Sequence, residues 1–410
     1  MILANTQLLN IIDCSAEESV AQRVKVFSRL NPGAKLLRLD SGDVVRPLSG
    51  SVIEAMQSSV VEMSLQGSFQ GRGPLGGYPF LIDAIGKGEY RSRKIKVDND
   101  EIFVNNGTKD GLSGIGDILC HDVRIAVVDP VYQSYVESNV VAGRAGDVGL
   151  SGNWSHLIYL ESGADDAFMP QLPEARPDVI YLCSPNDPTG CVLSHEELEK
   201  WVKYAAKNDV LILFDATYAP FISDATLPRS IYEVKGARKV AIEFRSFSKS
   251  AGFTGLHCGY IVIPKDIKGQ SIINGKVATL NEMWRKREDA KSYPPSYVVQ
   301  RAAEALYAPR GGAELRENVE YYMKNVSLLC EGLESTGLRF WGGENSPYIW
   351  VESPYESGWE LFDRLLEQCN IVASPGERFG PGGRGFVRLS AFADQNEVMR
   401  ASTRLSDFRV

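Results

Sequence analysis

The sequence lacks the features that would place the protein in a membrane or on nucleic acid. None of its apolar runs approaches the roughly 20 residues needed to span a bilayer. Its 44 lysines and arginines are outnumbered by 52 aspartates and glutamates, giving a formal net charge of −8 at pH 7. No basic run or basic–aromatic stripe interrupts this acidity, so neither partner is expected. The N-terminus lacks a basic start, and no secretory signal peptide is predicted.

Cysteine and histidine are too scattered to predict a disulfide framework or a metal site. The seven cysteines contain no Cys-x-x-Cys pair, which suits free thiols in a reducing compartment, and we expect a cytoplasmic protein. The four histidines show no metal-ligand spacing, so no metal is predicted. With 410 residues, of which 44% are hydrophobic, the chain can bury two cores.

Apolar runs alternate with amphipathic stretches between residues 55 and 265, which is the rhythm of βαβ units in an α/β protein. Four of the apolar runs are followed directly by polar clusters. Ligands of open α/β sheets bind outside the carboxyl ends of the strands, so these clusters should converge on one crevice. The clusters are 106–111, 184–190, 215–218 and 246–249.

Lys249 carries the main functional hypothesis. It follows an apolar run, is flanked by Ser246 and Ser248, and precedes closely spaced glycines. Hydroxyls and glycines around a buried amine suit a lysine that forms an imine with a phosphorylated aldehyde, namely pyridoxal phosphate (PLP). Taken alone, the segment also fits a solvated lysine in a Gly/Ser loop. The other three clusters favour the cofactor.

Residues of these clusters match the parts of PLP. The carboxylate of Asp215 can keep the pyridine nitrogen protonated, and a protonated ring stabilises a carbanion at the substrate's α-carbon. Tyr218 and Asn186 can reach the phenolic oxygen of the ring. Tyr132 is placed to stack on the ring face.

A second group of residues is predicted to hold the phosphate of the cofactor. Gly107, Thr108 and Lys109 would open a helix whose N-terminal amides bind the phosphate. Ser246 and Ser248 would donate further hydrogen bonds to it.

In their order and in their residues, these segments resemble those of the class I/II aminotransferases, which have PLP fold type I. The resemblance is strongest to the LL-diaminopimelate aminotransferases. The resemblance runs from about residue 36 to the C-terminus and is carried by residues 71–78, 244–255 and 342–351. It implies PLP as cofactor, amino acid and keto acid substrates, and a homodimer with shared active sites. It also implies that Arg388 binds the substrate's α-carboxylate, for which a guanidinium fork is suited.

The expected fold is that of this family. A large PLP-binding domain, residues 51–299, would contain a mainly parallel seven-stranded sheet. A smaller α+β domain would combine the two ends of the chain, residues 1–50 and 300–410.

The chain departs from the family's pattern at three positions. His257 stands where the family has an arginine that grips the phosphate, and imidazole is only partly charged near neutrality. Arg72 and Leu75 replace a tyrosine and a glutamate of the diaminopimelate enzymes, and Leu75 cannot bind a distal ammonium group. We expect Arg72 and Tyr293 to reach a neighbouring subunit's site, and we expect a different amino donor.

Three hypotheses about activity follow. The favoured one is an aminotransferase in which Lys249 is the general base. The alternative is a PLP-dependent elimination, replacement or cyclisation in specialised metabolism, for example on a sulfonium amino acid such as S-adenosylmethionine, because a fold does not fix its chemistry. A PLP-binding regulator would need a DNA-binding module, and none is apparent.

Residues 71–76 match the G-x-G-x-x-G pattern of dinucleotide-binding proteins. The match is weak, because Pro74 interrupts it and the residues before it make a poor strand.

Overall fold

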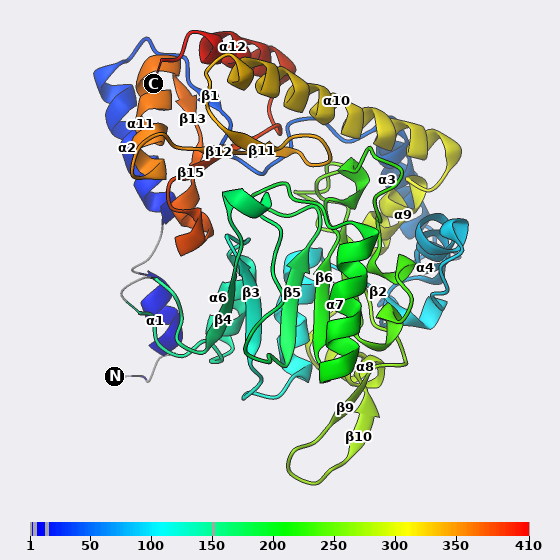
Figure 1. Ribbon diagram of the computed structural model, residues 1–410. Helices are drawn as coiled ribbons and strands as arrows, with labels where there is room; N and C mark the ends of the chain where they lie inside the picture. The colour runs from blue at the N-terminus through cyan, green and yellow to red at the C-terminus, as the bar shows by residue number, and fades with distance from the viewer. Residues whose placement is uncertain (1, 3–5, 13–15, 150–151, 410) are drawn as a thin grey trace.

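The computed structural model describes residues 2, 6–12, 16–149 and 152–409. Figure 1 shows a large α/β lobe below a smaller lobe, in which blue segments from the start of the chain lie beside orange and red segments from its end. The hairpin of β9 (Lys268–Gln270) and β10 (Val277–Thr279) projects from the large lobe, away from the smaller one (Figure 1). In the described part of the chain, every helix is too short or too polar to span a bilayer.

The large lobe is built on the predicted seven-stranded sheet, which is mainly parallel. Only β8 runs antiparallel to its two neighbours, β2 and β7. In spatial order the strands are β2 (Ile102–Asn105), β8 (Gly259–Val262), β7 (Ala241–Ser246), β6 (Leu211–Asp215), β5 (Val179–Cys183), β3 (Ile125–Asp129) and β4 (Leu157–Glu161).

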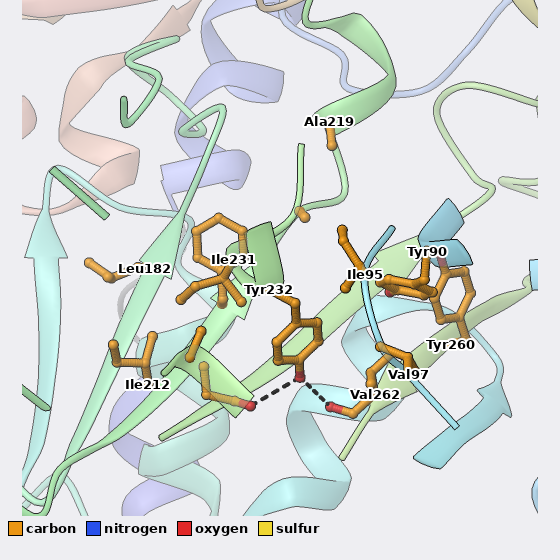
Figure 2. Close-up of a cluster of buried hydrophobic side chains, with 14 of the residues drawn as sticks. Tyr90, Ile95, Val97, Leu182, Ile212, Ala219, Ile231, Tyr232, Tyr260 and Val262 are labelled. Atoms are coloured by element: carbon orange, nitrogen blue, oxygen red, sulfur yellow. Dashed lines mark hydrogen bonds between the residues drawn. The ribbon is translucent and has the colours of Figure 1, made fainter. Parts of the chain in front are cut away.

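Both faces of this sheet are buried, which explains why its strands read as continuous apolar runs. Side chains alternate between the faces: Ile180 and Leu182 pack into one core, while Val179 and Tyr181 pack into the other. Figure 2 shows part of the first core, where the buried Tyr232 hydroxyl donates to the carbonyl oxygens of β7 and β8 at 3.0 and 3.1 Å. The one polar atom of that ring is thereby satisfied inside an apolar cluster.

Helices cover both faces of the sheet. On the first face lie α3 (Gly50–Met63), α4 (Pro79–Ile85), α7 (His195–Asn208) and α9 (Tyr297–Ala305). On the second lie α5 (Thr108–Ile115), α6 (Ser134–Val141) and α8 (Leu280–Lys291). Helix α7 begins after Ser194, whose hydroxyl accepts from the amide of Glu197 at 3.3 Å. The proline-containing segment 292–296 separates α8 from α9, as prolines do in a helical sequence.

The smaller lobe has its own core, to which both chain ends contribute. Its four-stranded sheet has the order β11 (Phe340–Gly342), β12 (Tyr348–Glu352), β15 (Phe386–Ser390) and β14 (Ser374–Pro375). A parallel pair joins β1 (Leu37–Arg38) near the start of the chain to β13 (Ile371–Val372) near its end. The helices are α2 (Ala16–Leu30), α10 (Pro309–Glu334), α11 (Gly358–Cys369) and α12 (Gln395–Ser406), and the short α1 (Thr6–Ile12) contacts α6 instead.

The two lobes share their longest helix. Arg310 and Glu314, in the first turns of α10, contact α3 of the large lobe, whereas Val326 and Leu329 of the same helix lie in the smaller lobe's core. Ala302, in α9, packs into the large lobe's core. The boundary expected at residue 300 therefore falls within α9, and the domain limits stay a prediction.

The strand order brings the predicted polar clusters to one edge of the sheet. Cys183 at the end of β5 is paired with Asp215 at the end of β6, and Ser246 at the end of β7 is paired with Gly259. Gly259 is also paired with Asn105, the last residue of β2. Because β8 is antiparallel, its first residue lies at the edge where the other strands finish.

Candidate active site

A cavity of about 350 Å³ lies at this edge, and it gathers most of the predicted site residues. Its volume falls within the range of roughly 300–1,000 Å³ that is typical of small-molecule sites. A larger hollow of about 760 Å³, lined by α3, α4 and α9, has lysine and arginine side chains that are already paired with neighbouring acids. The smaller cavity is lined by Asp43, Asn106, Gly107, Thr108, Lys109, Tyr132, Tyr135, Asp187, Asp215, Thr217, Tyr218, Ser246, Ser248, Lys249, Thr254 and His257.

Lys249 projects into the cavity from the loop after β7. The loop is tightened by a hydrogen bond from the amide of Ser248 to the hydroxyl of Ser246 at 3.1 Å. The lysine ammonium nitrogen Nζ donates to the carbonyl of Gly42 and lies 5.8 Å from the centre of the Phe392 ring. Burial lowers the pKa of Lys249, and nearby Arg388 acts in the same direction while Asp187 opposes it. A lowered pKa favours the neutral amine, which is the nucleophilic form.

Asp215 lies buried at the end of β6, with one hydrogen bond to each carboxylate oxygen. The hydroxyl of Tyr135 donates to Oδ2 at 2.7 Å, and the amide of Thr217 donates to Oδ1 at 2.9 Å. Burial raises the pKa of Asp215, while hydrogen bonding by the Thr217 side chain, by Tyr135 and by the Thr217 amide counteracts the rise. A buried carboxylate in this setting is stabilised by a cationic partner, and a protonated ring nitrogen would be one.

The predicted phosphate cradle forms where the start of α5 meets the start of β8. Gly107 precedes α5 with a φ of 98°, which favours glycine. A Cβ at Gly259 would lie 2.8 Å from the Cα of Gly107, so position 259 must be glycine for the two segments to approach this closely. The hydroxyl oxygens of Thr108 and Thr217 lie 2.7 Å apart. The loop thus points helix amides and hydroxyls into one end of the cavity.

Two basic side chains line this end of the cavity, and both are exposed. His257 adopts a left-handed backbone with a φ of 56°, and its amide donates to the carbonyl of Phe253 at 2.8 Å. Lys109, in the first turn of α5, is the second. Lys109 is therefore placed to bind the phosphate together with His257, which stands where the family has an arginine.

Tyr132 and Tyr218 also line the cavity. Tyr132 meets Tyr135 edge-on, with ring centres 5.6 Å apart. The hydroxyl of Tyr218 lies 2.8 Å from that of Tyr348 and donates to Asp187 Oδ2 at 3.3 Å. Burial raises the pKa of Tyr218 well above its ordinary value, so the phenol stays protonated and acts as a hydrogen-bond donor.

The turn after β5 presents a different residue from the one predicted. The side chain of Asn186 donates to the hydroxyl of Thr189 at 2.9 Å and is absent from the cavity lining. The next residue, Asp187, lines the cavity instead. Its Oδ1 accepts from Arg388 Nη1 at 2.6 Å.

Arg388 is buried beside the cavity, in β15 of the smaller lobe. Its guanidinium lies against the rings of Tyr348 and Phe379, 4.2 and 4.8 Å from their centres. Nη2 donates to the carbonyl of Asp40 at 3.1 Å. Burial lowers the pKa of Arg388, pairing with Asp187 raises it, and the net shift is upward, so the side chain carries a full charge.

Three predicted substrate residues lie outside the cavity of their own chain. Arg72, Leu75 and Tyr293 are exposed and are absent from its lining. The guanidinium of Arg72 lies 4.6 Å from the centre of the Tyr293 ring. Arg72 and Tyr293 therefore lie together on the surface.

Six residues that line the cavity had no predicted role: Asp43, Asn106, Tyr135, Asp187, Thr217 and Thr254. Thr217 and Asp187 belong to polar clusters that had been recognised, so their position at a strand end was a usable signal. Tyr135 and Asp43 had no such signal, because they reach the cavity from α6 and from the N-terminal segment.

Comparisons with known proteins agree on one family. The sequence model described as "Aminotransferase class I and II" matches residues 34–405. The chain is 46% identical over 409 residues to a Bacteroides fragilis protein named LL-diaminopimelate aminotransferase, covering 99% of this chain and 100% of that one. It is 45% identical over 410 residues to a Bacteroides thetaiotaomicron protein of the same name, covering 100% of both chains.

Solved structures show the same fold. The L,L-diaminopimelate aminotransferase from Chlamydomonas reinhardtii superposes with a TM-score of 0.90 at 33% identity, covering 99% of this chain and 98% of that one. An aspartate aminotransferase variant from Thermus thermophilus has a TM-score of 0.83 at 21% identity over 100% of both chains, which indicates the fold alone.

Proposed function

The chain belongs to the class I and II aminotransferases, it has PLP fold type I and it is an enzyme of amino-group transfer; on this premise we propose that it works with PLP bound covalently to Lys249. The amino group would pass from an amino acid to a 2-oxo acid. The comparisons favour this activity over elimination, replacement or cyclisation, because the relatives named above are aminotransferases.

The observation that carries the proposal is that the buried side chains of Lys249 and Asp215 line the same cavity. An amine with a lowered pKa suits the aldehyde of PLP, and a buried carboxylate suits its ring nitrogen. The start of α5, with Thr108, Ser246 and Ser248, supplies amides and hydroxyls for the phosphate. The donor set therefore fits the cofactor at both ends.

When bound, PLP supplies the electron sink that stabilises a carbanion at the α-carbon of the substrate. The chain's own residues position and move protons. Lys249 Nζ accepts the proton from the α-carbon of the substrate as general base. Asp215 would hold a proton on the ring nitrogen, and the Tyr218 hydroxyl, which donates to Asp187 in this structure, would turn to donate to the phenolic oxygen. Tyr132 covers the ring face.

The amino donor is proposed to differ from LL-diaminopimelate, for which the relatives are named. Leu75 is an aliphatic side chain and offers no charge or hydrogen bond to a distal ammonium group, while Arg72 adds a positive charge to the same loop. Because Arg72, Leu75 and Tyr293 are exposed and lie outside their own cavity, we propose that they complete the cavity of a second copy in a homodimer. A cytoplasmic enzyme is consistent with this assignment.

Borohydride reduction followed by peptide mass mapping tests the covalent bond. We expect the cofactor on Lys249 in the purified holoenzyme, and Lys249→Ala should lose the visible colour while keeping its melting curve. Lys235→Ala, at an exposed lysine, should keep both. An amino donor added alone should convert the cofactor to pyridoxamine phosphate. A different reduced lysine, or full turnover by Lys249→Ala, would show that the proposal is wrong.

A further inference from the structure

A buried ion pair joins the two lobes beside the cavity. Arg388 comes from β15 of the smaller lobe, and Asp187 comes from the turn after β5 of the large lobe. Arg388 Nη1 and Asp187 Oδ1 lie 2.6 Å apart, and the side chains are 7% and 6% exposed. The guanidinium expected to bind the substrate's carboxylate is thus already paired with a carboxylate of the protein.

Arg388 is fixed in this position from several sides. Two aromatic rings lie against its guanidinium, and the carbonyl of Asp40 accepts from Nη2. Its backbone lies between two strands, paired with Trp350 of β12 and Ser374 of β14. The guanidinium cannot turn away from Asp187 without leaving these contacts.

Asp187 is held equally firmly. The turn that carries it is closed by hydrogen bonds from the amide of Asn186 to the carbonyl of Cys191 at 2.8 Å, and from the amide of Gly190 to the carbonyl of Asn186 at 2.9 Å. The Tyr218 hydroxyl donates to the other oxygen of Asp187. The pair is therefore preformed.

This pair changes what Arg388 can offer to a ligand. A substrate carboxylate would be the second negative group against a single guanidinium, in a site where little water screens the repulsion. A neutral oxygen brings no such repulsion. In the described part of the chain, Arg388 Nε is buried and has no hydrogen-bond partner, while Asp187 itself lines the cavity.

We propose that Asp187 is a specificity-determining residue that neutralises Arg388, so that the site accepts, besides amino acids, amino substrates in which an uncharged group such as an amide, ester or alcohol replaces the α-carboxylate. The inference rests on the proposed function, because it takes the cavity to be the amino-substrate site. If the pair served only to hold the two lobes together, removing it would change the binding of charged and neutral ligands equally.

Equilibrium binding of propionate and propionamide to the holoenzyme tests this inference, because the two ligands differ in charge and carry no amine to react. Binding is followed by the shift it causes in the pH titration of the cofactor's visible band, at constant ionic strength. The wild type, Asp187→Asn and Asp43→Asn are compared. Asp43→Asn is the matched control, since Asp43 lines the same cavity, is exposed and does not pair with Arg388.

In the wild type, propionate should bind no more than roughly tenfold better than propionamide, because the guanidinium has no net charge to offer. Asp187→Asn should raise the preference for propionate by roughly 10- to 100-fold, the size of a hydrogen bond to a charged group. Asp43→Asn should change this preference less than about threefold, because an exposed charge is screened.

A wild-type preference for propionate above about 100-fold would overturn the inference, and this measurement stands even if Asp187→Asn does not fold. An unchanged preference in a folded Asp187→Asn would overturn it as well. In both cases a cofactor trapped on Lys249 would leave the proposed function intact. Absence of that covalent bond would overturn the proposed function and the inference together.

Discussion

Replacing Tyr135 by phenylalanine removes the hydroxyl that is hydrogen-bonded to Asp215 in the cavity. That hydroxyl donates to Asp215 Oδ2 at 2.7 Å, and the ring around it is fully buried. Phenylalanine keeps the ring and its packing, so the change is confined to one hydrogen bond. We expect the variant to fold, to bind PLP, and to transfer amino groups more slowly on the acid side of its pH range.

The magnitude follows from the loss of one donor to a charged acceptor. Such a bond contributes about 1.5–3 kcal/mol, and one pKa unit corresponds to about 1.4 kcal/mol, so the pKa of Asp215 should rise by about 1–2 units. Burial already raises that pKa, and Tyr135 is one of the groups that oppose the rise. Asp215 acts as a carboxylate, which is present above its pKa. A higher pKa of Asp215 therefore moves the acidic limb of the activity–pH profile to higher pH.

The assay is kcat/KM for amino transfer as a function of pH, together with urea unfolding. Tyr181→Phe is the matched control, because Tyr181 stacks on Tyr135 with ring centres 5.1 Å apart, and its hydroxyl accepts from Asn139 at 3.2 Å. Tyr135→Phe should lose about 1.5–3 kcal/mol of unfolding free energy, and Tyr181→Phe, whose bond joins neutral groups, about 1 kcal/mol. Only Tyr135→Phe should shift the acidic limb. Equal profiles for the two variants would refute the role given to Asp215.

Two further predictions concern the cofactor and the dimer. His257→Arg should tighten PLP binding by roughly tenfold, because a guanidinium binds phosphate with a full positive charge. The measurement is the dissociation constant of PLP, and His121→Arg, at the opposite edge of the sheet, should leave that constant unchanged. Arg72→Ala should lose activity and regain it in mixed dimers with Lys249→Ala, because each site would use Arg72 of the other subunit. Failure of the mixture to recover, or full activity of Arg72→Ala alone, would contradict a shared site.

Much of this architecture could be predicted from the sequence because the signals are local. Strands buried on both faces must be apolar throughout, so Val179–Cys183 and Leu211–Asp215 stand out as runs. A parallel sheet places the carboxyl ends of such runs at one edge, which is why the clusters around Lys249 and Asp215 were expected to meet. The mainly parallel seven-stranded sheet and the family are confirmed.

Only the tertiary structure decided which side chain faces the cavity and what it touches there. Asn186 and Asp187 are adjacent in one turn, and the backbone hydrogen bonds of that turn direct Asp187, not Asn186, into the cavity. Its partner Arg388 is 201 residues away and in the other lobe. A residue's type and neighbours specify its chemistry, but the pairing of two buried charges depends on how the lobes pack, and no local pattern records that.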